Sequence, residues 1–297
     1  MNAATHRFGG SWTERKLAIL KKYLGAYNQA LKKQPFRKMY VDAFAGSGSI
    51  EQISARAANA PSLFDDIPIP TSDSPEKMLE GSASIALQIS PPFDEWVFIE
   101  KNANRCADLE RLRGSYPDLA PRIQIRRGEA NEELKNLCEM DWSSTRAVMF
   151  LDPYGMQVEW QTIEKIAQTQ AVDMWLLFPL GIGLNRTLPR SGDIPTAWIR
   201  RINLFLGTDE WYEEFYTVEH NQDIFGQPHR EITKARIEVL ARFFIKRLEE
   251  IFPGVAPNPA VLSITANNPM YLFCFAAANA RGAKIALNIA KHLLNKI

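Results

Sequence analysis

Four carboxylates follow four apolar, strand-like segments of the sequence, and they are the residues that could do chemistry. They are Asp42, Glu100, Glu129 and Asp152. Polar groups at the carboxyl ends of successive parallel strands are where an open α/β sheet holds its ligand. One acidic strand end means little, but four in chain order predict a cofactor site along one edge of a sheet.

Two glycines, Gly46 and Gly48, follow the first carboxylate in the string Tyr-Val-Asp-Ala-Phe-Ala-Gly-Ser-Gly (40–48). Glycine lets the backbone turn sharply and approach a ligand closely. A dinucleotide fingerprint needs a third glycine where this chain has Glu51, and a phosphate-binding loop needs Gly-Lys-Ser/Thr, which does not follow. The spacing therefore excludes both of these nucleotide-binding loops.

The remaining pattern, Asp-x-Phe-Ala-Gly-Ser-Gly, resembles the first motif of class I S-adenosylmethionine-dependent methyltransferases. S-adenosylmethionine carries no phosphate, so its loop needs close backbone approach and an acidic partner. The resemblance implies that Asp42 holds the methionine amino group, directly or through water. It also implies that Gly46 and Gly48 leave room for the sulfonium and that Phe44 belongs to the cofactor site.

The interval to the second carboxylate indicates an insertion. A ribose-binding carboxylate usually follows the glycines by about 20 residues, but Glu100 stands 100 − 42 = 58 positions after Asp42. Residues 50–81 contain four prolines and no sustained periodicity, which predicts a flexible loop insertion. Without those 32 residues the interval is 26, an ordinary βαβ spacing. Residues 82–89 then form the first crossover helix, and Glu100 accepts both ribose hydroxyls.

The pair Gly128–Glu129 stands where this class commonly places a carboxylate that accepts a hydrogen bond from the adenine amino group. A strand-end Glu is also often a solvated terminus or a salt-bridge partner. That alternative stays open, above all for Glu129, because Asp is the commoner residue at this place.

The segment Asp152-Pro-Tyr-Gly155 resembles the Asp-Pro-Pro-Tyr segment of amino-methylating DNA methyltransferases, with one proline instead of two. The resemblance implies that Asp152 accepts hydrogen bonds from an exocyclic amine and that Tyr154 stacks on a flipped base. These two are the candidate catalytic residues. The missing proline weakens this interpretation, and Asp152 could instead line the cofactor pocket.

Several strings together resemble the three-Cys-motif partner family, TcmP. They are residues 40–48, Gly-Ser-Ala (81–83), Phe-Ile-Glu (98–100), Phe-Leu-Asp-Pro-Tyr-Gly (150–155) and Leu-Phe-Pro-Leu-Gly (177–181), with Lys16-Leu…Tyr23-Leu and Phe275–Asn279 besides. The family implies a methyltransferase-like fold, a bacterial or phage-related origin, and a partner protein with a cysteine motif like those of radical S-adenosylmethionine enzymes. It also implies that Arg186 is a substrate-side residue.

Composition favours one compact cytoplasmic protein. The 297 residues are 46% hydrophobic and 23% charged, and the net charge of +1 gives no global field towards nucleic acid or an anionic membrane. The three cysteines form no CxxC pair, so no metal site is expected. The start of the chain lacks the apolar core of a signal peptide, and no apolar stretch is long enough to span a bilayer.

The periodicities predict one α/β domain over residues 1–297, with a seven-stranded Rossmann-like methyltransferase sheet. An N-terminal helix covers 11–33, with its lysines on a solvated face, and a helical insertion covers 181–251. The last two strands are expected near 261–265 and 270–276, as an antiparallel pair. In the insertion, arginines alternate with aromatic residues, a composition that clamps phosphates and stacks bases. The competing interpretation is a helical subdomain with its own small core.

Two function classes follow from these patterns. The first is an S-adenosylmethionine-dependent methyltransferase that acts on nucleic acid or a nucleobase together with the cysteine-motif partner. The second is a non-catalytic binding module that uses the same fold to dock that partner.

Overall fold

The computed structural model describes residues 11–50, 79–222, 228–263 and 269–295. Five parallel strands form the centre of the main sheet. Four of them are buried along most of their length, whereas in the edge strand over 123–127 only Ile123 is buried. The five strands are β1 (Arg37–Asp42), β4 (Glu95–Glu100), β5 (Ile123–Arg127), β6 (Thr145–Leu151) and β7 (Val172–Phe178). The first four end at or within two residues before the four carboxylates that the sequence placed after strand-like segments.

The sheet order is β5-β4-β1-β6-β7, followed by the antiparallel strand β12 (Pro269–Ala277). Two short strands, β10 (Gly254–Val255) and β11 (Ala260–Ser263), pair with successive stretches of the outer edge of β12 and form one interrupted edge. The parallel part has the doubly wound order 3-2-1-4-5. The predicted Rossmann-like methyltransferase sheet, closed by an antiparallel pair, is confirmed.

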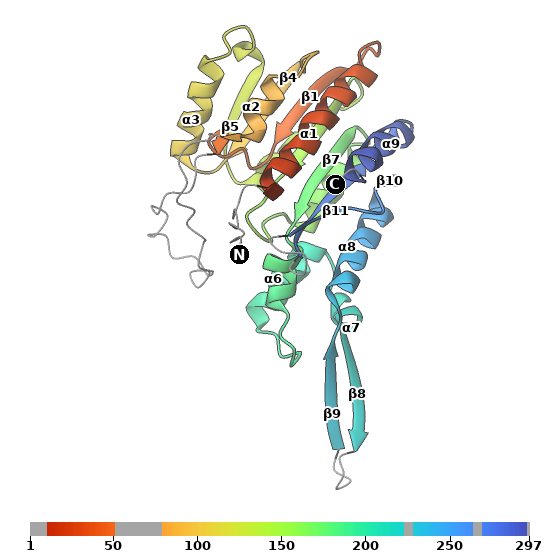
Figure 1. Cartoon of the computed structure of the whole chain (residues 1–297). Helices are drawn as coiled ribbons and strands as arrows, with labels where there is room; N and C mark the ends of the chain where they lie inside the picture. The colour runs from red at the N-terminus through yellow and green to blue at the C-terminus, as the bar shows by residue number, and fades with distance from the viewer. Residues whose placement is uncertain (1–10, 51–78, 223–227, 264–268, 296–297) are drawn as a thin grey trace, which may run out of the picture.

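Helices cover both faces of the sheet (Figure 1). One face packs against α1 (Ser11–Ala30), α2 (Ser82–Leu87), α3 (Ala103–Gly114) and α9 (Ala283–Leu294). The other packs against α4 (Ala130–Cys138), α5 (Trp160–Gln168) and α8 (Ile237–Ile251). Among the described residues, no helix combines the length and apolar character needed to cross a membrane.

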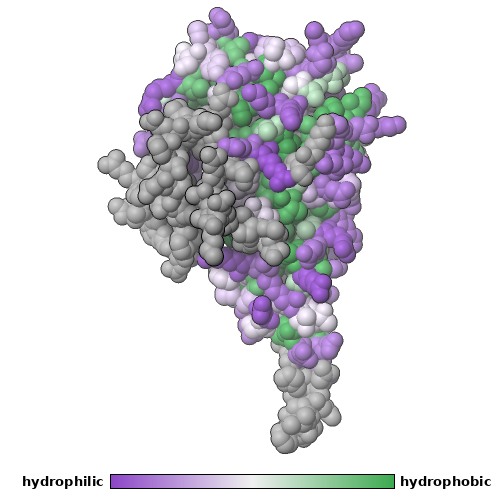
Figure 2. Space-filling model, viewed as in Figure 1, coloured by the Kyte–Doolittle hydropathy of each residue, from purple (hydrophilic) through white to green (hydrophobic). Residues whose placement is uncertain are grey.

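The surface in Figure 2 follows from this layering. Hydrophilic residues dominate the rim of the visible face, and hydrophobic residues lie between them, in the middle of that face. The apolar side chains of the strands are mostly enclosed between the two helical layers, as expected for a sheet buried on both faces.

The predicted loop insertion, residues 50–81, lies largely outside the described residues. Its ends are described: β2 (Ser49–Ile50) pairs antiparallel with β3 (Leu79–Glu80). The chain therefore leaves and re-enters the domain at one place, and α2 begins directly afterwards, at Ser82. This geometry agrees with treating the segment as an insertion into an ordinary βαβ unit.

The insertion at 181–251 is not wholly helical, which corrects the prediction. It contains α6 (Thr196–Leu206) and α7 (Trp211–Phe215), but then an antiparallel hairpin of β8 (Tyr216–Gln222) and β9 (Pro228–Lys234). The hairpin projects from the body of the molecule (Figure 1). Val218 and Ile232 are paired across the hairpin, and helical structure resumes only with α8, which begins at Ile237.

Helix α1 is fastened to the sheet by a buried hydrogen bond as well as by its apolar face. Leu20, Tyr23 and Leu24 are fully buried. The Tyr23 hydroxyl donates to Asp173 Oδ2 on β7 over 2.5 Å. Burial raises the pKa of Asp173 and the hydrogen bond from Tyr23 lowers it. Because the effect of burial is larger, the pKa is raised to about 7. The carboxyl is therefore half protonated near neutral pH.

We expect Asp173→Asn to flatten the dependence of stability on pH. An unfolded Asp titrates near 3.8, whereas folded Asp173 titrates near 7, so the folded chain binds more protons between these values. The stability contributed by the protonated carboxyl is present below about pH 4 and is lost as the pH rises through about 7. Melting temperatures measured from pH 5 to pH 8 should fall less steeply in the variant than in the wild type. An unchanged slope, with exposed Asp209→Asn as control, would contradict the assignment.

Candidate functional site

One cavity of about 1090 Å³ lies at the carboxyl edge of the parallel strands. Its walls come from the segments that follow β1, β4, β5, β6 and β7, together with α1 and β12. Three of the four strand-end carboxylates line it: Glu100, Glu129 and Asp152. The volume slightly exceeds the usual range for small-molecule sites, about 300–1,000 Å³.

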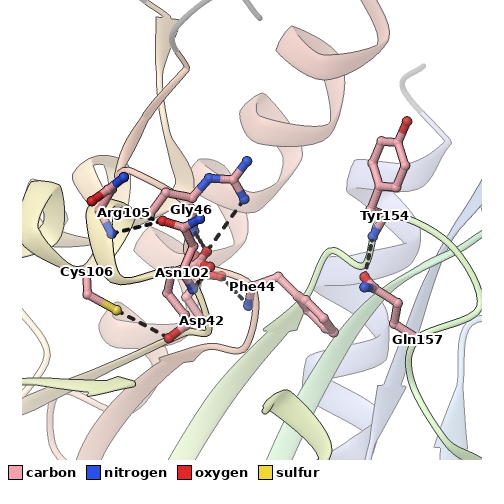
Figure 3. A network of polar contacts seen from close by, with 10 residues as sticks. Asp42, Phe44, Gly46, Asn102, Arg105, Cys106, Tyr154 and Gln157 are labelled. Carbon is pink, nitrogen blue, oxygen red and sulfur yellow. Dashed lines mark hydrogen bonds and ion pairs between the residues drawn. The ribbon is translucent and has the colours of Figure 1, made fainter. Parts of the chain in front are cut away.

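Glu100 is held in place by the backbone of two neighbouring loops. Its Oε2 accepts from the Gly46 N–H at 3.0 Å, and its Oε1 accepts from the Asn102 N–H at 2.7 Å (Figure 3). Arg105 lies 3.9 Å from Oε2. The side chain is nearly buried, yet it stands on the cavity wall. A carboxylate has about four acceptor positions, so two remain for a ligand.

Asp42 lies beneath the glycine loop and not on the cavity wall. It is fully buried and accepts from the Phe44 N–H and the Tyr40 hydroxyl, each at 3.3 Å. Burial is the main cause that raises its pKa to about 7, the negative charge of Asp152 adds to this, and the hydrogen bond from Ser82 opposes it. The side chain is therefore enclosed below the loop and is not among the residues that line the cavity.

Gly46 and Gly48 are required at their positions for different structural reasons. Both have positive φ, +62° and +75°, a backbone conformation that residues other than glycine rarely adopt. A Cβ on Gly48 would lie 2.7 Å from Leu112 of α3, whereas a Cβ on Gly46 would meet open space. Gly48 thus allows the loop to pack on the helix. From this loop, Ala43 and Phe44 reach the cavity wall.

Glu129 caps helix α4. Its Oε2 accepts from the backbone N–H groups of Asn131 and Glu132, at 2.8 Å and 3.1 Å. Gly128 and Glu129 line the cavity as predicted, but the carboxylate also stabilises a helix start, which the sequence analysis did not consider. Its second oxygen accepts from the Asn131 amide at 2.9 Å, so few acceptor positions remain for an adenine amino group.

Asn131 is a site residue that sequence reasoning missed. Its buried side-chain amide donates to Glu129 and to the Gln157 carbonyl, and its oxygen accepts from the Glu159 N–H and the Thr162 hydroxyl. These bonds join the loop after β5 to the loop after β6, which carries Tyr154. Because an Asn at the start of a helix usually serves the helix itself, no sequence pattern indicates such a bridge.

Asp152, Tyr154 and Arg186 all line the same cavity as Glu100 and Glu129. The Tyr154 ring is 65% exposed, and its backbone N–H donates to Gln157 Oε1 at 3.0 Å (Figure 3). Arg186 is exposed and forms no ion pair with any other described residue. A ring free to stack and a cation free to pair are therefore both available to a ligand.

Lys16 was placed on a solvated face of the first helix, and the structure corrects this. Only 4% of the residue is exposed, its ammonium forms an ion pair with Asp152 Oδ2, and it lines the cavity. The aromatic residues of the insertion also contradict the interpretation that they stack on bases. Phe205, Trp211, Phe215 and Tyr216 are buried and cannot stack on bases. They belong to the core cluster on the α4 and α5 side of the sheet and form no separate core.

Among the described residues, no group of three or more His, Cys, Asp or Glu side chains could hold a metal ion. All three cysteines are free: Cys106 and Cys274 are buried and Cys138 is half-buried. The cavity is lined by carboxylates, by cations such as Lys16 and Arg186, and by uncharged polar residues such as Asn102 and Gln157.

No protein-family model matches the chain, and no curated protein matches it. Among solved structures, a Legionella pneumophila protein of the family DUF519 is similar at 15% identity and a TM-score of 0.41, over 78% of this chain and 91% of that one. The yhhF protein of Escherichia coli, provisionally designated a methyltransferase, has 13% identity and a TM-score of 0.33, over 73% of this chain and 85% of that one. Spermidine synthase from Thermotoga maritima has 11% identity and a TM-score of 0.35, over 90% of this chain and 59% of that one. These similarities are too distant to argue from, so the fold assignment rests on the order and direction of this chain's own strands.

Proposed function

We propose that this chain is an S-adenosylmethionine-dependent methyltransferase. The observation that carries the proposal is Glu100, a carboxylate fixed on the cavity wall by the N–H of Gly46 and with acceptor positions to spare. Paired ribose hydroxyls are the donors that such a carboxylate binds. S-adenosylmethionine fits the residues present, because the glycine loop brings backbone and the Phe44 ring to the same wall without a phosphate-binding cradle.

The acceptor end of the cavity, defined by Asp152, Tyr154 and Arg186, supports a planar amine as the second substrate. Asp152 can accept a hydrogen bond from the amine, Tyr154 can stack on a ring, and Arg186 can pair with an anionic group. When bound, the cofactor supplies a methyl group on a sulfonium. The amine nitrogen forms the new bond, the sulfur keeps the electron pair of the broken one, and the proton of the amine leaves to solvent. Alignment alone contributes about 7–11 kcal/mol to such a step. A nucleobase or nucleotide carries all three features.

A projecting hairpin favours a partner as well. The strands β8 and β9 pair only with each other among the described residues, and a two-stranded ribbon is marginally stable by itself in water. We therefore propose that the chain acts with a partner protein, and that this partner bears the cysteine motif implied by the TcmP resemblance. Membership of TcmP and a bacterial origin belong to the same proposal. A cytoplasmic location is proposed too, since the free cysteines suit a reducing compartment.

The alternative is a non-catalytic module that binds the partner and transfers no methyl group. It shares the fold and the hairpin but has no need of a transferable methyl beside Asp152. Cofactor affinity and turnover therefore separate the two proposals.

The cofactor proposal predicts that Glu100→Gln weakens binding of S-adenosylhomocysteine at least tenfold. The substitution keeps the shape of the side chain but places an N–H group where the ribose hydroxyls need an acceptor. Isothermal titration calorimetry on the purified chain measures the affinity, with Glu110→Gln on the surface of α3 as the matched control. Equal affinities in wild type and Glu100→Gln, with the same melting temperature, would reject the proposed ribose contact.

The acceptor proposal predicts that Asp152→Asn retains S-adenosylhomocysteine affinity within about threefold but loses methyl transfer by about two orders of magnitude. A positioned acceptor group typically contributes a factor of this size. Transfer of radiolabelled methyl from S-adenosylmethionine to total nucleic acid and to mixed nucleotides measures the activity. A variant that transfers methyl normally would exclude the orienting role, and one that no longer binds the cofactor would place Asp152 in the cofactor site.

A further inference from the structure

Lys16 introduces a positive charge into the acceptor end of the cavity from a distant part of the chain. Its ammonium is paired with Asp152 Oδ2 and lies 5.3 Å from the ring centroid of Trp12 and 5.9 Å from that of Phe150. Both rings are close enough for a cation–π attraction. A buried ammonium so enclosed is costly to displace, because the carboxylate would then be left without a partner. Lys16 is therefore a fixed part of the wall.

The pairing changes the charge that a ligand meets. The acceptor end holds two cations, Lys16 and Arg186, and one carboxylate, Asp152. Asp152 is 26% exposed, so its unpaired charge would otherwise attract cations into the cavity. With Lys16 on Oδ2 the carboxylate is neutralised, while Oδ1 accepts no hydrogen bond from another described residue. The site keeps one acceptor for an amine but presents a net positive charge.

The same region has a flat apolar wall. The rings of Trp12 and Tyr271 stack with centroids 5.4 Å apart and planes 25° apart, and both residues line the cavity with Tyr154. Tyr271 is buried and Trp12 is half-buried, whereas Tyr154 is 65% exposed. An exposed ring such as that of Tyr154 stacks on planar ligands without regard to sequence. An extended aliphatic amine gains little from such a ring.

We propose that Lys16 is a specificity-determining residue which, by neutralising Asp152, excludes cationic aliphatic amines and selects a neutral amine on an anionic planar ligand. The chemical class is a nucleotide with an exocyclic amine, either free or within a strand. This inference rests on the proposed methyltransferase function, since it concerns the acceptor of that reaction. Specificity here comes from repulsion of the wrong ligand as much as from attraction of the right one.

The test is calorimetry on the full chain saturated with S-adenosylhomocysteine, using adenosine 5′-monophosphate and putrescine as the two probes. The wild type should bind the nucleotide and show no measurable affinity for putrescine. Lys16→Met should bind the nucleotide at least tenfold more weakly and gain putrescine binding. Lys16→Arg should behave as the wild type, because it restores the charge, and Lys21→Met, an exposed lysine on the same helix, is the matched control.

Loss of the buried charge could unfold Lys16→Met, so Lys16→Gln is measured beside it. Its amide can still donate to Asp152 Oδ2 while the positive charge is gone, and it should also gain putrescine binding. The double variant Lys16→Met/Asp152→Asn should not gain it, because the carboxylate charge is absent. The inference is overturned if the wild type binds putrescine more tightly than the nucleotide. It is also overturned if the ratio of the two affinities is unchanged in both Lys16→Met and Lys16→Gln. Failure of the wild type to bind S-adenosylhomocysteine would instead reject the proposed function itself.

Discussion

The site depends on how the fold satisfies four carboxylates gathered at one edge of a parallel sheet. Neighbouring negative charges repel each other, and each buried carboxylate needs hydrogen-bond donors. The four are satisfied in different ways: Asp42 by the Phe44 N–H, Tyr40 and Ser82, Glu100 by Gly46 and Asn102 N–H groups, Glu129 by the first turn of α4, and Asp152 by Lys16. The donors that hold each carboxylate decide how much of it remains available to a ligand.

This difference separates Asp152 from the other two carboxylates that line the cavity. Glu100 and Glu129 are held largely by backbone N–H groups of the loops that follow the strands. At the acceptor end, Asp152 depends on a lysine 136 positions away. The placement of α1 on the sheet therefore determines what surrounds Asp152, and the bond from Tyr23 to Asp173 is one of the contacts that fix this placement.

The insertion after β7 is connected to the same end. Lys234, at the base of the hairpin, donates to the carbonyls of Asn185 and Leu188, on either side of Arg186, at 2.8 Å and 2.6 Å. Tyr216 donates to the Pro189 carbonyl at 2.7 Å. The hairpin and the exposed arginine thus share one support, and a partner that docks on the hairpin would act close to the acceptor end.

The sequence by itself determined the parallel strands and the glycine loop, because apolar runs and glycines reflect local backbone requirements. It also brought Glu100, Asp152 and Arg186 to one cavity, since the ends of parallel strands share one edge of a sheet. Only the tertiary structure decided the burial of Lys16, the capping role of Glu129, the bridging amide of Asn131 and the hairpin in the insertion. These depend on which distant group lies opposite each side chain. A lysine on a helix has the same local pattern whether it faces water or a carboxylate 136 residues away, so only the packing of α1 on the sheet distinguishes the two.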